Sequence, residues 1–132
     1  IINDSYNSNP LSAECAVNTL SGFEAKGRRI MVSGDMLELG DASVEAHRKL
    51  GRLIAQSSID VLMCVGNLSI KTADGARAGG MEESRVRVCN GTIEAAKLLS
   101  ETVRTGDVVL IKGSRRMKME EIIGCFTTYY TH

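Results

Sequence analysis

The chain has 132 residues, a length that fits one domain able to bury about two thirds of its unfolded surface. Its 16 basic residues balance its 16 acidic residues, and a net charge of zero provides no overall field to attract nucleic acid or an anionic membrane surface. No apolar run approaches the roughly 18 residues of a membrane-spanning helix. Because the chain opens on Ile1 and Ile2 without a methionine, we expect it to be an excised piece of a longer protein.

Five short apolar and β-branched runs indicate buried parallel strands, and apolar residues at helical spacing lie between them. The expected strands are 1–2, 29–33, 61–65, 86–89 and 108–112, and the helical patterns are 13–20, 46–54, 69–78, 95–103 and 119–126. Asn9 and Pro10 are typical of the N-cap and first position of a helix. Strands that alternate with helices predict an α/β fold, with a mostly parallel sheet of five or six strands and helices on both faces. Residues 127–132 fit either a frayed helix end or an edge strand.

The cysteines are widely spaced, form no CxxC pair and lie in apolar stretches, so we interpret them as buried free thiols of a reducing compartment. They are Cys15, Cys64, Cys89 and Cys125. This interpretation predicts a cytoplasmic protein. With only His47 and His132 available besides these thiols, we predict no metal site within the chain.

Ligands of open parallel sheets bind beyond the carboxyl ends of the strands. Polar residues are concentrated after the first, second and fifth expected strands, in the loops 3–10, 34–41 and 112–118. The loops after the third and fourth strands contain Gly66-Asn67 and Asn90-Gly91, which are typical of ordinary turns. This asymmetry predicts a site on one part of the sheet edge.

The first two polar loops contain candidate ligand contacts. Asp4 and Asn7 come too early to cap the following helix, so they are candidates for contacting a ligand, whereas Asn9 serves as the cap. Asp35 and Glu38 fit either a ligand contact or a solvated surface, because later residues suffice as caps of the second helix. His47 fits a helix-surface residue better than a catalytic base.

Four cations crowd the start of the last helix, where the helix dipole disfavours positive charge. They are Lys112, Arg115, Arg116 and Lys118. An anion or an acidic partner at this place would explain them, and a solvated basic face explains them equally well. The sequence contains no G-x-x-x-x-G-K-[ST] phosphate loop, dinucleotide fingerprint, nucleophile elbow or H-E-x-x-H helix. We therefore predict no complete active site and assign no catalytic residue within this chain.

Three blocks in this order and spacing resemble the C-terminal domain of the Mur ligases of bacterial cell-wall synthesis, and most closely the members that add D-alanyl-D-alanine. The blocks are Asp4-Ser5-Tyr6-Asn7-Ser8-Asn9-Pro10, then Gly34-Asp35-Met36-Leu37-Glu38-Leu39-Gly40 with His47-Arg48 beyond, then Lys112-Gly113-Ser114-Arg115 running to Met117-Lys118-Met119-Glu120. Each block alone is weak, but the set spans nearly the whole chain. The resemblance implies that residues 1–132 form a single Rossmann-like domain that closes onto the rest of a three-domain enzyme.

The reaction that the resemblance implies uses ATP and magnesium to join D-alanyl-D-alanine to UDP-N-acetylmuramoyl-tripeptide through an acyl phosphate. The N-terminal domain would hold the UDP-sugar peptide, and the central domain would hold the phosphates and the metal. In this chain Asp4, Asn7 and Asn9 would line the nucleotide. On the substrate side the resemblance places Lys112, Ser114 and Arg115, with Asp35 and Glu38 as further candidates.

Two other readings stay open at this point. One is another ligase of the same type or a ligase that resembles folylpolyglutamate synthase, although the Lys112-Gly113-Ser114-Arg115 block favours the dipeptide adder. The other is a stand-alone binding module that has the fold without the catalysis. A phosphate loop encoded upstream would favour a ligase.

Overall fold

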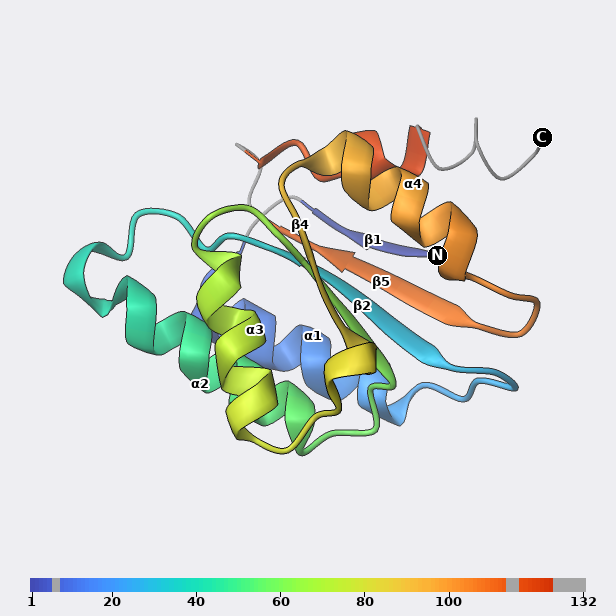
Figure 1. The fold of residues 1–132 in the computed structure, drawn as a ribbon, viewed down its shortest axis with the longest axis horizontal. Coiled ribbons are helices and arrows are strands. Elements are labelled where there is room, and N and C mark those ends of the chain that lie inside the picture. Colours follow the sequence, from blue (N-terminus) through green and yellow to red (C-terminus); the bar gives the residue numbers. More distant parts are fainter. Residues whose placement is uncertain (6–7, 114–116, 125–132) are drawn as a thin grey trace.

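Five parallel strands form one open sheet in the order β1-β5-β2-β3-β4 (Figure 1). The computed structural model describes residues 1–5, 8–113 and 117–124. The strands are β1 (Ile2–Asp4), β2 (Arg29–Gly34), β3 (Val61–Val65), β4 (Val86–Cys89) and β5 (Val108–Lys112). The central strands β2, β3 and β5 are buried on both faces, which explains why their sequences are almost continuously apolar. The predicted parallel sheet is confirmed, with five strands among the described residues.

Helices cover both faces of this sheet, as predicted (Figure 1). The helices are α1 (Pro10–Gly22), α2 (Ser43–Ala55), α3 (Ser69–Ala78) and α4 (Thr92–Thr102), with 3-10 turns η1 (Gly40–Ala42) and η2 (Glu83–Arg85). Residues 120–124 are also helical. The first three helices share one face, and α4 with 119–122 covers the other. The result is a three-layer α/β/α arrangement.

Two separate apolar cores lie on the two sides of the sheet because successive strand side chains point in opposite directions. Met31, Leu62 and Leu110 pack with the first three helices, whereas Ile30 and Val32 pack with α4 and the last helical segment. Helix α1 buries Ala13, Ala16, Val17 and Leu20 along the predicted face. These contacts fix the helices against the sheet and hold its carboxyl edge in one shape.

Glycines allow α2 and α3 to approach each other closely. A Cβ atom at Gly51 would lie 2.0 Å from the carbonyl oxygen of Thr72, and one at Gly75 would lie 2.1 Å from that of Arg48. Both obstacles are backbone atoms, which cannot move away without shifting a helix. The helix pair therefore depends on the absence of side chains at these two positions.

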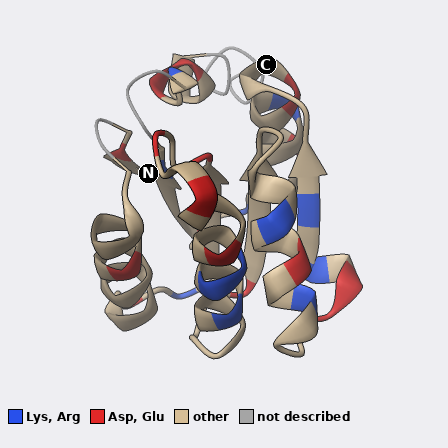
Figure 2. Ribbon diagram, turned by 90° about the vertical axis from the view of Figure 1, so that its left-hand side faces the viewer, with Lys and Arg blue, Asp and Glu red and all other residues tan. Residues whose placement is uncertain are grey.

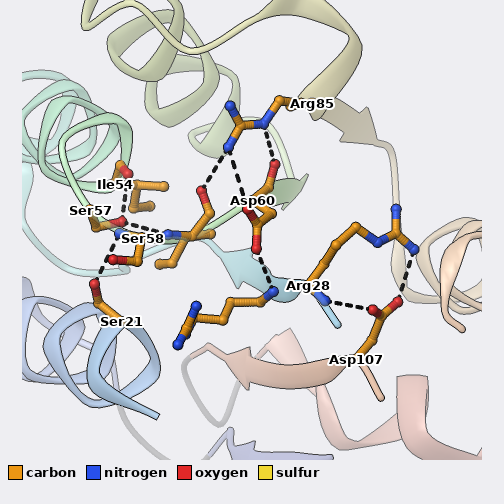
Figure 3. A network of polar contacts seen from close by, with 10 residues as sticks. Ser21, Arg28, Ile54, Ser57, Ser58, Asp60, Arg85 and Asp107 are labelled. Carbon is orange, nitrogen blue, oxygen red and sulfur yellow. Dashed lines mark hydrogen bonds and ion pairs between the residues drawn. The ribbon is translucent and has the colours of Figure 1, made fainter. Parts of the chain in front are cut away.

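The amino ends of the strands are closed by a polar network (Figure 3). Asp107 accepts hydrogen bonds from the backbone N–H of Arg28 at 2.7 Å and from its guanidinium at 2.8 Å. Asp60 accepts from the backbone N–H of Arg29 at 2.8 Å, and Arg85 donates to the Asp60 carbonyl oxygen at 2.6 Å. These contacts join the starts of four neighbouring strands, at the edge opposite to the polar loops.

Burial opposes the ionisation of Asp107, but hydrogen bonds from Arg28 and from the Arg104 backbone outweigh it and lower the pKa of this carboxyl below its ordinary value. The carboxylate is therefore favoured in the folded chain.

Two expectations from the sequence are wrong in detail. Cys15 is exposed on α1, whereas Cys64 and Cys89 are buried as expected; Cys125 lies outside the described residues. Burial raises the pKa of the Cys64 thiol, and it raises that of Cys89 to about 11. Helix α2 also lacks the expected side-chain cap, because η1 leads directly into it.

Acidic and basic segments are interspersed along the helices and loops (Figure 2), in keeping with the zero net charge. Within the described ranges, no helix combines the length and the apolar character needed to cross a membrane.

Candidate functional site

The three polar loops meet at one edge because of the strand order. Strands β1, β5 and β2 are neighbours, so the loops that follow Asp4, Lys112 and Gly34 start side by side. The loops after β3 and β4 follow on one side of this group. The sequence predicted a site on part of the edge, and the structure brings the three loop starts together there.

Asp4 and Lys112 are the central ion pair of this edge. They are register partners on adjacent strands, and the Lys112 Nζ lies 3.2 Å from the Asp4 Oδ1. The Lys112 side chain is only 3% exposed, whereas that of Asp4 is 43% exposed. The buried ammonium therefore meets a carboxylate that remains open to solvent. The resemblance implies different ligands for these two residues, and the structure places them in contact.

A methionine side chain, that of Met119, packs over the carboxyl ends of β2 and β5. Met119 is buried against Gly34 and Gly113, where a Cβ atom would come within 2.9 Å of its sulfur and 2.2 Å of its Cγ, respectively. The two glycines thus admit the Met119 side chain over the ends of both strands. This contact returns the chain to the edge immediately after the loop that carries Ser114 and Arg115, which themselves lie outside the described residues.

Asp35 is buried, and its carboxylate joins the loop after β2 to the start of α3. Its Oδ1 accepts hydrogen bonds from the backbone N–H and the hydroxyl of Ser69, each at 2.7 Å. Ser69 is the first residue of α3, which has no cap from its own preceding side chain. A carboxylate is favourable at a helix N-terminus, so Asp35 acts as a cap from a distant part of the sequence.

Gly66 provides the space for the Asp35 carboxylate. A Cβ atom at position 66 would lie 2.6 Å from Oδ2 and 2.7 Å from Oδ1, and its backbone has a φ of +110°. Both carboxylate oxygens therefore face the turn between β3 and α3. The sequence predicts Gly66 as part of an ordinary turn, but a glycine is needed there because any side chain would collide with Asp35.

His47 holds the other end of the same loop. Its ring is fully buried, and its Nε2 accepts a hydrogen bond from the Met36 backbone N–H at 3.0 Å. Because Nε2 accepts, the proton lies on Nδ1, which donates to the carbonyl oxygen of Ser43 at 2.6 Å. The interpretation of His47 as a helix-surface residue is wrong, because the ring points inward and uses both nitrogens.

Glu38 lies between Asp35 and His47 in the chain, and it is exposed. Its φ of 64° places a non-glycine residue in the left-handed region, and Gly40 follows with a φ of 58°. Asn9 caps α1 as predicted, with its side-chain oxygen accepting from the Ser12 N–H at 2.9 Å. Asn7 lies outside the described residues.

Sequence reasoning missed Ser69, Gly66 and the structural role of His47. Asp35 and Ser69 are 34 residues apart, so no local capping pattern reveals their contact. The signal for His47 was its place beside Ala46 and Leu50 on the predicted apolar face. A polar residue on such a face is buried with its hydrogen bonds made.

The described residues supply one polar wall and not a phosphate cradle. They hold no group of three or more His, Cys, Asp or Glu side chains arranged to bind a metal ion. The Asp4 carboxylate suits hydroxyl or amine groups of a ligand, and the Lys112 ammonium beside it limits the negative charge of this edge.

A family model described as the Mur ligase, glutamate ligase domain matches residues 1–115, which include the starts of all three polar loops. The chain belongs to the Mur ligase family. It is 37% identical over 123 residues to the UDP-N-acetylmuramoyl-tripeptide--D-alanyl-D-alanine ligase of Bacillus subtilis, covering 93% of this chain and 27% of that protein. The Escherichia coli ligase of the same name is 35% identical over 127 residues, with 93% of this chain and 26% of that protein covered.

Solved structures of Mur ligases share the fold. A crystal structure of MurF from Acinetobacter baumannii aligns with a TM-score of 0.82 and 29% identity, covering 94% of this chain and 27% of that one. MurF from Thermotoga maritima in complex with ADP aligns with a TM-score of 0.77 and 25% identity, covering 96% of this chain and 27% of that one. The chain thus spans about a quarter of the length of these Mur ligases.

Proposed function

We propose that this chain is the C-terminal domain of a three-domain ATP-dependent ligase that adds D-alanyl-D-alanine to UDP-N-acetylmuramoyl-tripeptide in peptidoglycan synthesis. The observation that carries the proposal is the likeness to ligases of this name over 93% of the chain. The chain spans 27% of such a relative, which fits one domain of a larger enzyme.

In the proposed reaction the tripeptide carboxylate attacks the γ-phosphorus of ATP, and ADP leaves. The amine of D-alanyl-D-alanine then attacks the acyl carbon, the amide bond forms, and phosphate and a proton depart. Magnesium, held by the central domain, would offset the phosphoryl charge. This chain would supply a wall of the closed site that orients the ligands and excludes water.

The roles that we propose for individual residues come from the resemblance to these ligases. Asp4, with a carboxylate open to solvent, would contact the nucleotide, together with Asn7 and Asn9. Lys112 would hold Asp4 in place and present positive charge to the reacting centre, and Ser114 and Arg115 would bind the incoming dipeptide. The contact between Asp4 and Lys112 would make nucleotide and substrate binding interdependent.

Glu38 would complete the substrate side from the neighbouring loop.

We also place the enzyme in the cytoplasm. The free thiols of Cys15, Cys64 and Cys89 are consistent with a reducing compartment.

The test is phosphate release by the full-length protein with ATP, magnesium, UDP-N-acetylmuramoyl-tripeptide and D-alanyl-D-alanine. We expect turnover that requires all of them, and we expect Lys112→Ala to lower kcat/KM by about tenfold or more, as for loss of a positioned charge near developing negative charge. Lys97→Ala is the matched control, because Lys97 is exposed on α4, away from the polar loops. Its kcat/KM should stay within about twofold of the wild-type value.

Other outcomes would identify the rival readings. Turnover that requires a single amino acid in place of the dipeptide would indicate a different adding enzyme of this type. ATP binding without any turnover would indicate a binding module.

A further inference from the structure

We infer that Asp35 and His47 are positioning residues that fix the loop of residues 36–40 at the carboxyl edge of the sheet. The inference rests on the proposed function, and it assigns to Asp35 an indirect role in place of direct contact with substrate. It is carried by the contacts that hold the two ends of the loop.

The first anchor is Asp35, which is 6% exposed. Both of its oxygens face the turn before α3, and Ser69 donates two hydrogen bonds to Oδ1 at 2.7 Å. A carboxylate that is buried in this way and bonded to Ser69 through Oδ1 is poorly placed for direct contact with a ligand. Its effect on the site must therefore pass through the backbone of the loop.

The second anchor is His47, which is 0% exposed. It accepts from the Met36 N–H and donates to the Ser43 carbonyl oxygen, so a single ring spans the loop from its beginning to the start of α2. Met36 is itself 1% exposed and packs in the core beside α2. The ring thus ties the loop to a rigid helix.

The loop needs such anchors because its backbone is unfavourable by itself. Glu38 has a φ of 64° and Gly40 a φ of 58°, and a left-handed glutamate persists only where surrounding contacts impose it. Leu39 is partly buried and packs against the same core as Met36. The polar contacts of Asp35 and His47 act together with this apolar packing to hold the shape of the loop.

The 36–40 loop begins close in register to Lys112 of the Asp4–Lys112 ion pair. Ser33 is the register partner of Lys112, and Asp35 lies two residues beyond Ser33, just past the end of β2. A displacement of the 36–40 backbone changes the wall beside Lys112. Because a misplacement of about 1 Å can lower a rate about a hundredfold, loss of Asp35 or His47 should lower the rate of the ligase reaction.

The experiment compares Asp35→Ala and His47→Leu with Asp107→Ala in the full-length protein. Asp107 is a matched control, since its side chain is 2% exposed and also accepts several hydrogen bonds, but at the opposite edge of the sheet. Steady-state kinetics are measured at a temperature where every variant is folded. Hydrogen exchange of the peptide that covers 35–42 is measured in parallel.

We expect Asp35→Ala and His47→Leu to lower kcat/KM by about tenfold or more, with a larger rise in the KM for D-alanyl-D-alanine than for ATP. Exchange in 35–42 should increase in both. Asp107→Ala should lower the melting temperature while kcat/KM stays within about twofold. Normal kinetics in the two anchor variants, or an equal kinetic loss in Asp107→Ala, would overturn the inference.

Conservative variants separate positioning from general damage and serve if a larger change prevents folding. Glutamine carries both an acceptor and a donor, so His47→Gln should recover most of the kcat/KM that His47→Leu loses. Ser69→Ala removes one of the two hydrogen bonds to Asp35 and should give a smaller loss than Asp35→Ala.

If the wild-type protein shows no turnover that depends on D-alanyl-D-alanine, the proposed function fails, and hydrogen exchange alone decides the inference. Faster exchange in 35–42 for the anchor variants but not for Asp107→Ala would then support the anchoring. Unchanged exchange would overturn it.

Discussion

Substituting Gly66 with alanine tests the contact on which the Asp35 anchor depends. Gly66 precedes α3 with a φ of +110°, and Gly80 follows α3 with a φ of +100°. An alanine at either position is strained by about 1–3 kcal/mol, because L side chains seldom adopt this backbone. At Gly80 the new Cβ meets nothing within 4 Å, so Gly80→Ala measures the strain alone.

At Gly66 the new Cβ would also lie 2.6 Å from the Asp35 Oδ2. The carboxylate must then move away from Ser69, whose buried N–H loses its acceptor at a cost of about 1–3 kcal/mol. With about 2.1 cal/mol/K of unfolding entropy per residue, 132 residues give about 0.28 kcal/mol/K. We therefore expect Gly66→Ala to melt about 4–11 °C below Gly80→Ala.

The assay is thermal unfolding of the chain followed by far-UV circular dichroism. A double variant makes the cause explicit. In an Asp35→Ala background the carboxylate is absent, so adding Gly66→Ala should lower the melting temperature only as much as Gly80→Ala does. Equal melting temperatures for the two single glycine variants would refute this account of Gly66.

Two further predictions concern stability. Gly51→Ala should destabilise the chain by about 1–3 kcal/mol despite its gain in helix propensity, because its Cβ would meet backbone atoms of α3 at 2.0 Å. Gly22→Ala, whose Cβ would meet nothing within 4 Å, should stabilise the chain by up to about 1 kcal/mol. Urea unfolding measures both free energies, and a stabilised Gly51→Ala would contradict the close packing of α2 and α3. The pKa of Asp107 is lowered in the folded chain, so its contribution to the free energy of unfolding is present above the ordinary value of 3.8 and is lost as the pH falls through the folded-state value. Asp107→Asn should therefore flatten the acid side of the stability profile, and an unchanged profile would contradict the role of the Arg28 contacts.

Local patterns in the sequence determined the secondary structure with little error. The buried face of α1 is the predicted one, and Asn9 with Pro10 begins the helix as expected. Strand β3 and helix α3 have the predicted bounds. These features depend on neighbours within a turn or two along the chain, so periodicity and capping rules are sufficient to find them.

The sequence also determined which loops are polar, but only the tertiary structure decided that they meet. The strand order places β5 between β1 and β2, and this brings Lys112 into contact with Asp4, 108 positions earlier in the chain. The bond between Asp35 and Ser69 was decided in the same way. Such contacts join residues far apart in sequence, and the same side chains would also be consistent with a solvated surface. Packing of the helices and the order of the strands select between these alternatives, and neither is encoded in a short window of residues.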